Sequence, residues 1–309
     1  AAEVWKIIAA PDNPVWPGWN ARDTPLLLYL PNDQELLIGH PRPPAGFRPY
    51  AGPLEFPGAS IWVRNDTTLV TSDGQNTSMD VEGVRTLVVA DPLSNLRLNI
   101  ASLLEDPRPG TEKARKLEAS TLAPDPYAQL GLIVHEAFHV FQDRAHPERG
   151  GNEGLLAIYP VLSVDNNVGF GLEALALDEV LRAKTTADAR RAALRWLAAR
   201  EERRRPLDRR AIQYEDGTEF AEGLAKYTEY QLWESLEGRE PSSGLARAQG
   251  FAGYHDLSRR RAALAADMRA HLRGEVNVNN APFGTAPARM RLYYSGMGIA
   301  VLLDRLAPG

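Results

Sequence analysis

The chain of 309 residues contains no cysteine, which excludes both disulfide bonds and thiolate metal ligands. It also lacks an excess of basic residues: the formal net charge is −5, which gives no electrostatic reason to bind nucleic acid or an anionic membrane. No apolar run approaches the roughly 18 residues that a membrane-spanning helix needs. Histidine is scarce, with six in the chain, so a metal site would have to be built from these few imidazoles and from glutamate.

Two of the histidines occur in the segment His135-Glu136-Ala137-Phe138-His139, which has the pattern H-E-x-x-H. Residues four apart lie on the same face of a helix, so the two imidazoles would sit side by side and could hold Zn²⁺. Glu136 would then lie close enough to take a proton from an attacking water molecule. The alternative is a pair of buried histidines that satisfy each other's hydrogen bonds.

The residues around this motif predict a buried helix. Asp125 and Pro126 offer an N-cap and a proline at the first helical position, and Pro147 with Gly150 ends the helical pattern. The residues next to the two histidines are uncharged. A metal held there would therefore have a dry environment of low dielectric constant.

A third ligand must come from elsewhere in the chain. Histidine does not occupy the place that the metzincin pattern requires, because Gln142 and Ala145 stand at its glycine and histidine positions. The segment Glu222-Gly223-Leu224-Ala225-x-Tyr227-x-Glu229 instead resembles the E-G-[FL]-A-x-Y-x-E segment of aminopeptidase N-type enzymes. The resemblance implies that Glu222 binds zinc and that Gly223 allows two helices to approach each other. Glu219, one turn earlier, and Glu173 remain open as alternative ligands.

The two motifs together resemble the gluzincins, the zinc metallopeptidases whose third ligand is a glutamate. Residues 140–221 separate the second histidine from Glu222, whereas aminopeptidases have a short spacer there. Lys226 stands where thermolysin-like enzymes have an aspartate, so the chain fits neither family as a whole. Zincins also need a donor for the oxyanion of the transition state, and we expect Tyr294 to be that donor.

The sequence predicts an α+β fold with an irregular and β-rich region over residues 1–124 and a helical metallopeptidase domain over 125–309. Strands are expected at residues 26–30, 60–71 and 79–90, with a hairpin turn at 72–76. Helices are expected at 96–105, 111–120, 170–183, 187–204, 216–236 and 299–306, and a linker at 207–214. The arginines Arg200, Arg203, Arg204 and Arg205 are interpreted as a solvated helix end that complements the helix dipole.

From these patterns we expect a zinc-dependent peptidase that acts on peptide or protein substrates, with His135, His139 and Glu222 as ligands and Glu136 as the base. The alternatives are a protein that binds zinc but is catalytically inactive and a purely structural helical protein without metal. No nucleic-acid partner and no membrane span are expected. The chain begins at Ala1 without a methionine, which either a removed secretory signal or a trimmed chain would explain, and we expect an extracytoplasmic location, secreted or periplasmic.

Overall fold

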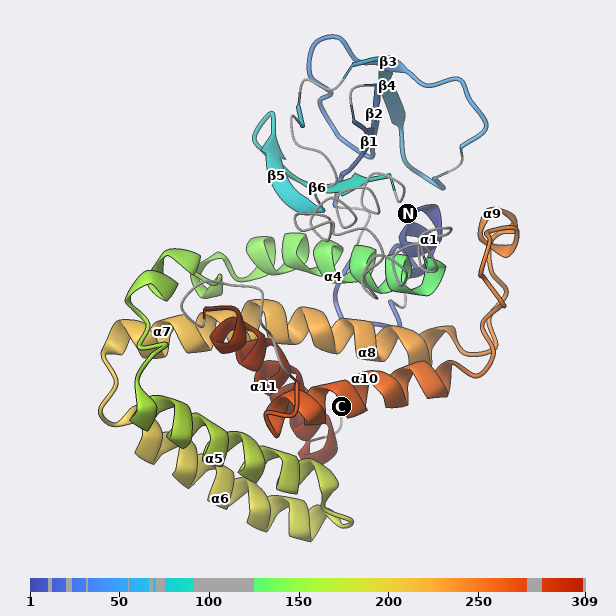
Figure 1. The fold of residues 1–309 in the computed structure, drawn as a ribbon. Helices are drawn as coiled ribbons and strands as arrows, with labels where there is room; N and C mark the ends of the chain where they lie inside the picture. The colour runs from blue at the N-terminus through green and yellow to red at the C-terminus, as the bar shows by residue number, and fades with distance from the viewer. Residues whose placement is uncertain are drawn as a thin grey trace, which may run out of the picture. The chain divides into compact units, whose positions relative to one another are not determined.

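The computed structural model describes residues 1–10, 13–20, 24–31, 33–54, 56–66, 69–70, 76–91, 125–276 and 285–307. The fold is α+β, as the sequence predicts: a six-stranded mixed sheet lies in the N-terminal part, and helices follow it (Figure 1). Within these residues, no helix is both long and apolar enough to cross a membrane.

The contacts divide the chain into two compact units. The first contains residues 1–141 and 235–255, and the second contains residues 142–234 and 256–309. The domain boundary expected from the sequence, at residue 125, would place helix α4 (Pro126–Ala145) with the later helices. The contacts instead place most of α4 in the first unit.

The sheet of the first unit has the strand order β3-β4-β2-β1-β6-β5. Its strands are β1 (Leu26–Leu30), β2 (Gln34–Ile38), β3 (Arg48–Pro49), β4 (Ile61–Arg64), β5 (Thr77–Val81) and β6 (Val84–Ala90). Strand β1 pairs antiparallel with β2 and parallel with β6. Alternate residues Leu27, Tyr29, Leu37 and Val88 point to one face and form a buried apolar cluster.

Strands β5 and β6 form a hairpin whose turn differs from the predicted one. The expected turn at 72–76 falls mostly outside the described residues, and the expected strand at 79–90 is instead broken by a two-residue turn at Glu82 and Gly83. Both turn residues have positive φ, 47° and 74°. Two positive φ angles are typical of the type I′ turn, whose twist matches that of paired strands.

The N-terminal segment, expected to be irregular, begins with helix α1 (Ala2–Ile8) and continues into a tryptophan-rich stretch. Trp19 is buried, and its ring lies edge-on to Phe138 of α4 at a centroid distance of 5.3 Å. Trp16 also contacts Phe138, at 4.9 Å. This stretch therefore forms part of the core around the predicted metal-binding helix.

Helix α4 begins as predicted. The Asp125 carboxylate accepts a hydrogen bond from the backbone N–H of Tyr127, which satisfies one of the free donors at the helix start. Its end at Ala145 precedes Pro147, as expected. The predicted helices at 96–105 and 111–120 lie outside the described residues.

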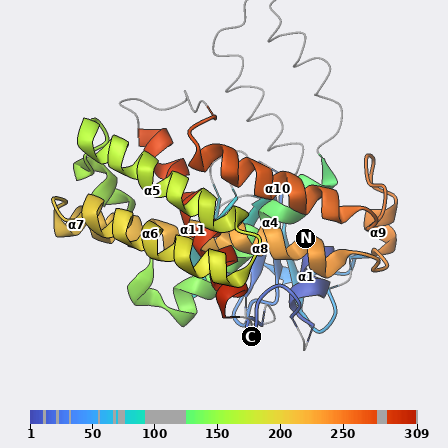
Figure 2. The same cartoon turned by 90° about the horizontal axis from the view of Figure 1, so that it is seen from below.

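The described part of the second unit contains helices and connecting turns but no strand. It begins with the short 3-10 turns η2 (Pro147–Arg149) and η3 (Glu153–Ile158). The helices that follow are α5 (Val164–Arg182), α6 (Thr186–Arg204), α7 (Arg209–Thr218), the π turn η4 (Glu219–Gly223), α8 (Leu224–Leu236), α10 (Leu257–Leu272) and α11 (Thr285–Leu306). The short α9 (Ser243–Ala246) belongs to the first unit. Helices α5 and α6 lie side by side as a hairpin (Figures 1 and 2). The prediction of a linker at residues 207–214 is wrong, because most of this segment belongs to α7.

The interpretation of the α6 arginines as a solvated helix end is also wrong for three of the four. Arg203 is buried, and it donates to Glu173 at 2.6 Å and to Glu215 at 2.6 and 2.8 Å. Arg200 pairs with Glu173 and Glu219, and Arg204 pairs with Glu215. These charges fasten α6 to α5, α7 and η4, and Arg205 is the exposed member of the set.

Candidate metal centre

The histidines of the H-E-x-x-H motif lie side by side on α4. The His135 and His139 rings meet edge-on, with a centroid distance of 4.8 Å and an interplanar angle of 85°. His135 is buried and His139 is half-buried, while Ala137 and Phe138 between them are buried. Glu136 is half-buried on the same turn of the helix.

Glu222 lies in the π turn η4, between α7 and α8. In a regular α-helix, Glu219 and Glu222 would share one face, because residues three apart are neighbours. A π turn has i→i+5 hydrogen bonds and an extra residue, so it changes the direction of the side chains that it carries. Here the two carboxylates go to different partners: Glu219 binds Arg200 and Ser295, and Glu222 binds Arg289.

The glycine after Glu222 has the close-packing role that the sequence indicated, and its neighbour is α11. A Cβ built on Gly223 would lie 2.5 Å from the Cα of Gly296 and 3.0 Å from the backbone nitrogen of Met297. A Cβ on Gly296 would in turn lie 2.4 Å from the carbonyl oxygen of Glu219. Helix α11 therefore touches the backbone of the π turn directly.

Two side chains of α11 face Glu222. Arg289 donates to its Oε1 at 3.2 Å and also donates to Glu153 at 3.0 Å. The Arg289 guanidinium lies 5.1 Å from the ring centre of Tyr293. Burial raises the pKa of Tyr293 above its usual range, and the charge of Glu222 and a hydrogen bond to its carboxylate raise it further. The Glu222 carboxylate therefore accepts hydrogen bonds from both Arg289 and Tyr293.

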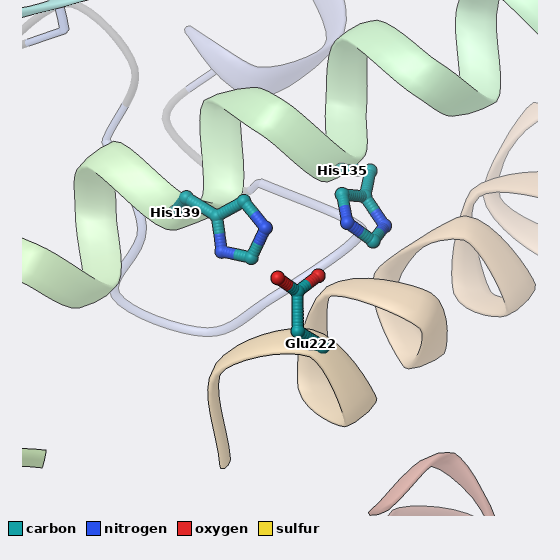
Figure 3. Close-up of side chains that lie close together, drawn as sticks. All are labelled: His135, His139 and Glu222. Carbon is teal, nitrogen blue, oxygen red and sulfur yellow. The ribbon is translucent and has the colours of Figure 1, made fainter. Parts of the chain in front are cut away.

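The structure brings His135, His139 and Glu222 together. Each offers one ligand atom, and these atoms all lie within 4.8 Å of one another. Figure 3 shows the two rings on α4 and the carboxylate on η4 pointing toward one another. Two imidazole nitrogens and one carboxylate oxygen form a ligand set that could hold a metal ion.

The two alternative ligands have other partners. Glu219 is buried and is held by Arg200 and Ser295. Glu173 is buried and accepts hydrogen bonds at 2.6 Å from both Arg200 and Arg203. Of the three candidate acids, Glu222 is the one whose oxygen belongs to the histidine group.

The comparisons with known proteins found no relative of the chain. No protein-family model matches the chain, and neither a curated protein nor a solved structure matches it. The likeness to gluzincins therefore rests on the motif residues themselves.

Tyr294, the expected transition-state donor, is engaged elsewhere in the second unit. Its hydroxyl donates to Asp267 of α10, and its ring stacks on His271 with a centroid distance of 3.9 Å. Burial raises the pKa of Tyr294 above its usual range, and Asp267 adds to the shift. Its role in catalysis stays a prediction, and this geometry does not favour it.

Sequence reasoning missed Arg289 and Tyr293, the two residues of α11 that contact Glu222. Their spacing of four places them on one helix face, a signal that the sequence contains. Because Pro287, Gly296 and Gly298 are unfavourable inside a helix, the sequence indicated a helix only from residue 299 onward.

Proposed function

We propose that this chain is a zinc-dependent peptidase in which His135, His139 and Glu222 bind Zn²⁺. The convergence of these three ligand atoms from distant parts of the sequence is the observation that carries the proposal. Catalytic zinc sites commonly have three nitrogen or oxygen ligands from the protein and one open position, and this donor set fits that rule. The absence of cysteine fits as well, because the site needs no thiolate.

The chain supplies a base for hydrolysis next to its ligands. Zinc, when bound, would polarise a peptide carbonyl and lower the pKa of water at the site. Glu136 follows His135 directly, so its carboxylate is the group that would take the proton from the attacking water and pass it to the leaving amine. Arg289, which donates to Oε1 of Glu222, would hold this carboxylate in place beside the histidines.

The proposal is tested by metal content and hydrolysis measured on the same preparations. Purified chain, loaded with zinc and desalted, should retain one zinc per molecule by elemental analysis and should digest unfolded casein. A chelator should stop the digestion, and zinc added back should restore it. Glu136→Gln should keep the zinc and lose activity by roughly 10²-fold or more, because it removes the base but no ligand.

His146→Ala serves as the matched control, since His146 lies near the end of the same helix, is 52% exposed and is outside the ligand group. It should keep both zinc and activity, whereas His139→Ala should lose both. Hydrolysis that survives chelation, or a wild-type chain without zinc, would refute the proposal. Stoichiometric zinc without hydrolysis of casein or of a peptide library would identify the inactive zinc-binding alternative.

A further inference from the structure

Helix α5 carries an apolar stripe on its exposed face. Val168, Leu172 and Leu175 are 58%, 61% and 49% exposed, although residues of these types are normally buried. Half of the large apolar side chains that are exposed in the described part of the chain lie between residues 158 and 175. Such clustering, unlike scattered exposure, is typical of an interaction surface.

The stripe has the spacing of a helix–helix seam. Asp165, Val168, Leu172, Leu175, Glu179 and Arg182 follow one another at intervals of three, four, three, four and three residues. This alternation keeps the residues on one face of a helix and is the pattern by which two helices pair along their length. The opposite face of α5, with Phe170, Ala174 and Leu177, is buried in the second unit.

A glycine in the same face has no explanation within the chain. Gly171 lies in the middle of α5, where glycine costs about 1 kcal/mol relative to alanine. Apart from its chain neighbours and the nearby backbone of α5 itself, no heavy atom of the described residues lies within 4 Å of a Cβ built on Gly171, so packing in the chain does not require glycine there. A neighbouring helix that approaches the stripe closely would require it.

We propose that this stripe is a self-association surface, on which α5 of a second copy of the chain packs antiparallel. A two-fold axis between residues 173 and 174 sets Leu172 opposite the partner's Leu175. The same axis sets Gly171 opposite the partner's Ala176, so that two small residues meet where the helices cross.

The charges at the two ends of the stripe fit the same arrangement. Asp165 at one end faces the partner's Arg182 at the other, and the symmetry creates this pair twice, as an isologous interface requires. Arg182 is 55% exposed, and its in-chain partner Asp178 is also bound by Arg269 and Arg273, so Arg182 can take a second partner. Glu179 faces the partner's Val168 with its aliphatic stem, while its carboxylate stays paired with Arg195 of α6.

The experiment is sedimentation velocity of the full chain over protein concentrations of about 1 to 200 µM, a range suited to the weak dimer that one helix pair supports. The wild type should shift from monomer to dimer within this range. Leu172→Glu should weaken the dimer at least tenfold. Leu303→Glu is the matched control, because Leu303 is 58% exposed on α11 and lies outside the stripe; it should dimerise as the wild type does.

A charge reversal tests the register. Asp165→Arg alone and Arg182→Asp alone should each weaken the dimer several-fold, and the double variant should regain the wild-type affinity. A chain that stays monomeric throughout the range refutes the proposal, and so does a dimer that Leu172→Glu leaves intact. A monomeric chain that binds neutral phosphatidylcholine vesicles through Leu172 would also refute it, by making a lipid surface the occupant.

Discussion

Gly223 and Gly296 bring two helices into backbone contact: a Cβ on Gly223 would lie 2.5 Å from the Cα of Gly296. This contact holds α11 against the π turn that carries both Glu219 and Glu222. Side chains of α11 then bind each of the two carboxylates, Ser295 the first and Arg289 the second. The close approach of two backbones thus fixes the direction of a candidate metal ligand.

Gly223→Ala should destabilise the chain by about 1–3 kcal/mol, because the added methyl group forces the two backbones apart. Gly171→Ala is the opposite case, since it adds a methyl group in open space on a helix and should stabilise the chain by about 0.5–1 kcal/mol. Urea denaturation at low micromolar protein concentration measures both. Equal effects of the two substitutions would show that the Gly223 contact is looser than described.

The assignment of Glu222 as the ligand predicts opposite behaviour for two neighbouring acids. Glu222→Gln should lose stoichiometric zinc but change the unfolding free energy of the metal-free chain by less than about 1 kcal/mol, because its pair with Arg289 is partly exposed. Glu219→Gln should keep the zinc but lower the unfolding free energy by about 2 kcal/mol or more, because it removes one of the two buried carboxylates that pair with Arg200. Elemental analysis and urea denaturation separate the two results, and a reversed pattern would make Glu219 the ligand.

Arg203→Met should be among the most damaging single substitutions in the second unit. Arg203 is buried between Glu173 and Glu215, so its loss leaves each of these two buried carboxylates with one arginine instead of two, at a cost of about 3–5 kcal/mol. Arg195→Met is the control, since Arg195 and its partner Glu179 are both more than half exposed, and such pairs contribute about 0–1 kcal/mol. Similar denaturation midpoints for the two variants would contradict the ionic network.

Glu215 also predicts how the stability of the second unit depends on pH. Burial by itself would raise the pKa of this carboxyl, but hydrogen bonds and charges from Arg203 and Arg204 outweigh it and hold the pKa below its ordinary value of 4.5. A lowered pKa in the folded chain contributes stability above about pH 4.5 and loses it as the pH falls through the folded value.

Urea midpoints measured from pH 7 down to pH 3 should therefore fall steeply below about pH 4.5 in the wild type. Glu215→Gln should be less stable at pH 7 and should show a shallower fall. Glu179→Gln, which removes an exposed carboxylate on α5, should follow the wild-type curve. A Glu215→Gln curve parallel to the wild type would remove Glu215 from the acid response.

Structural features that depend on a few neighbouring residues could be predicted from the sequence. The apolar run at Leu26–Leu30 gave strand β1, and Asp125 before Pro126 gave the start of α4. The i, i+4 spacing of His135 and His139 was sufficient to place two imidazoles together. The third ligand needed a family resemblance as well, because no local rule connects α4 to a glutamate 83 positions further along the chain.

Features that depend on distant partners could not be predicted. Arg203 is charged and near a helix end, which normally means solvent, and only its acids on α5 and α7 explain its burial. The π turn adds one residue to a helix without changing which residue types favour helices, so the sequence predicted one continuous helix there. Tyr293 and Tyr294 are adjacent and alike in type, and the rotation of α11 decides which of them meets Glu222.

The ionic network around Arg203 also constrains how this sequence can change over evolutionary time. The buried acids Glu173, Glu215 and Glu219 each pair with two of the arginines Arg200, Arg203 and Arg204, so a single replacement in this set leaves buried charges with fewer partners. Single substitutions in this set are therefore costly, whereas joint replacement of several members by apolar residues of similar volume can be neutral or stabilising. Descendants of a common ancestor should accordingly carry the set either whole or not at all.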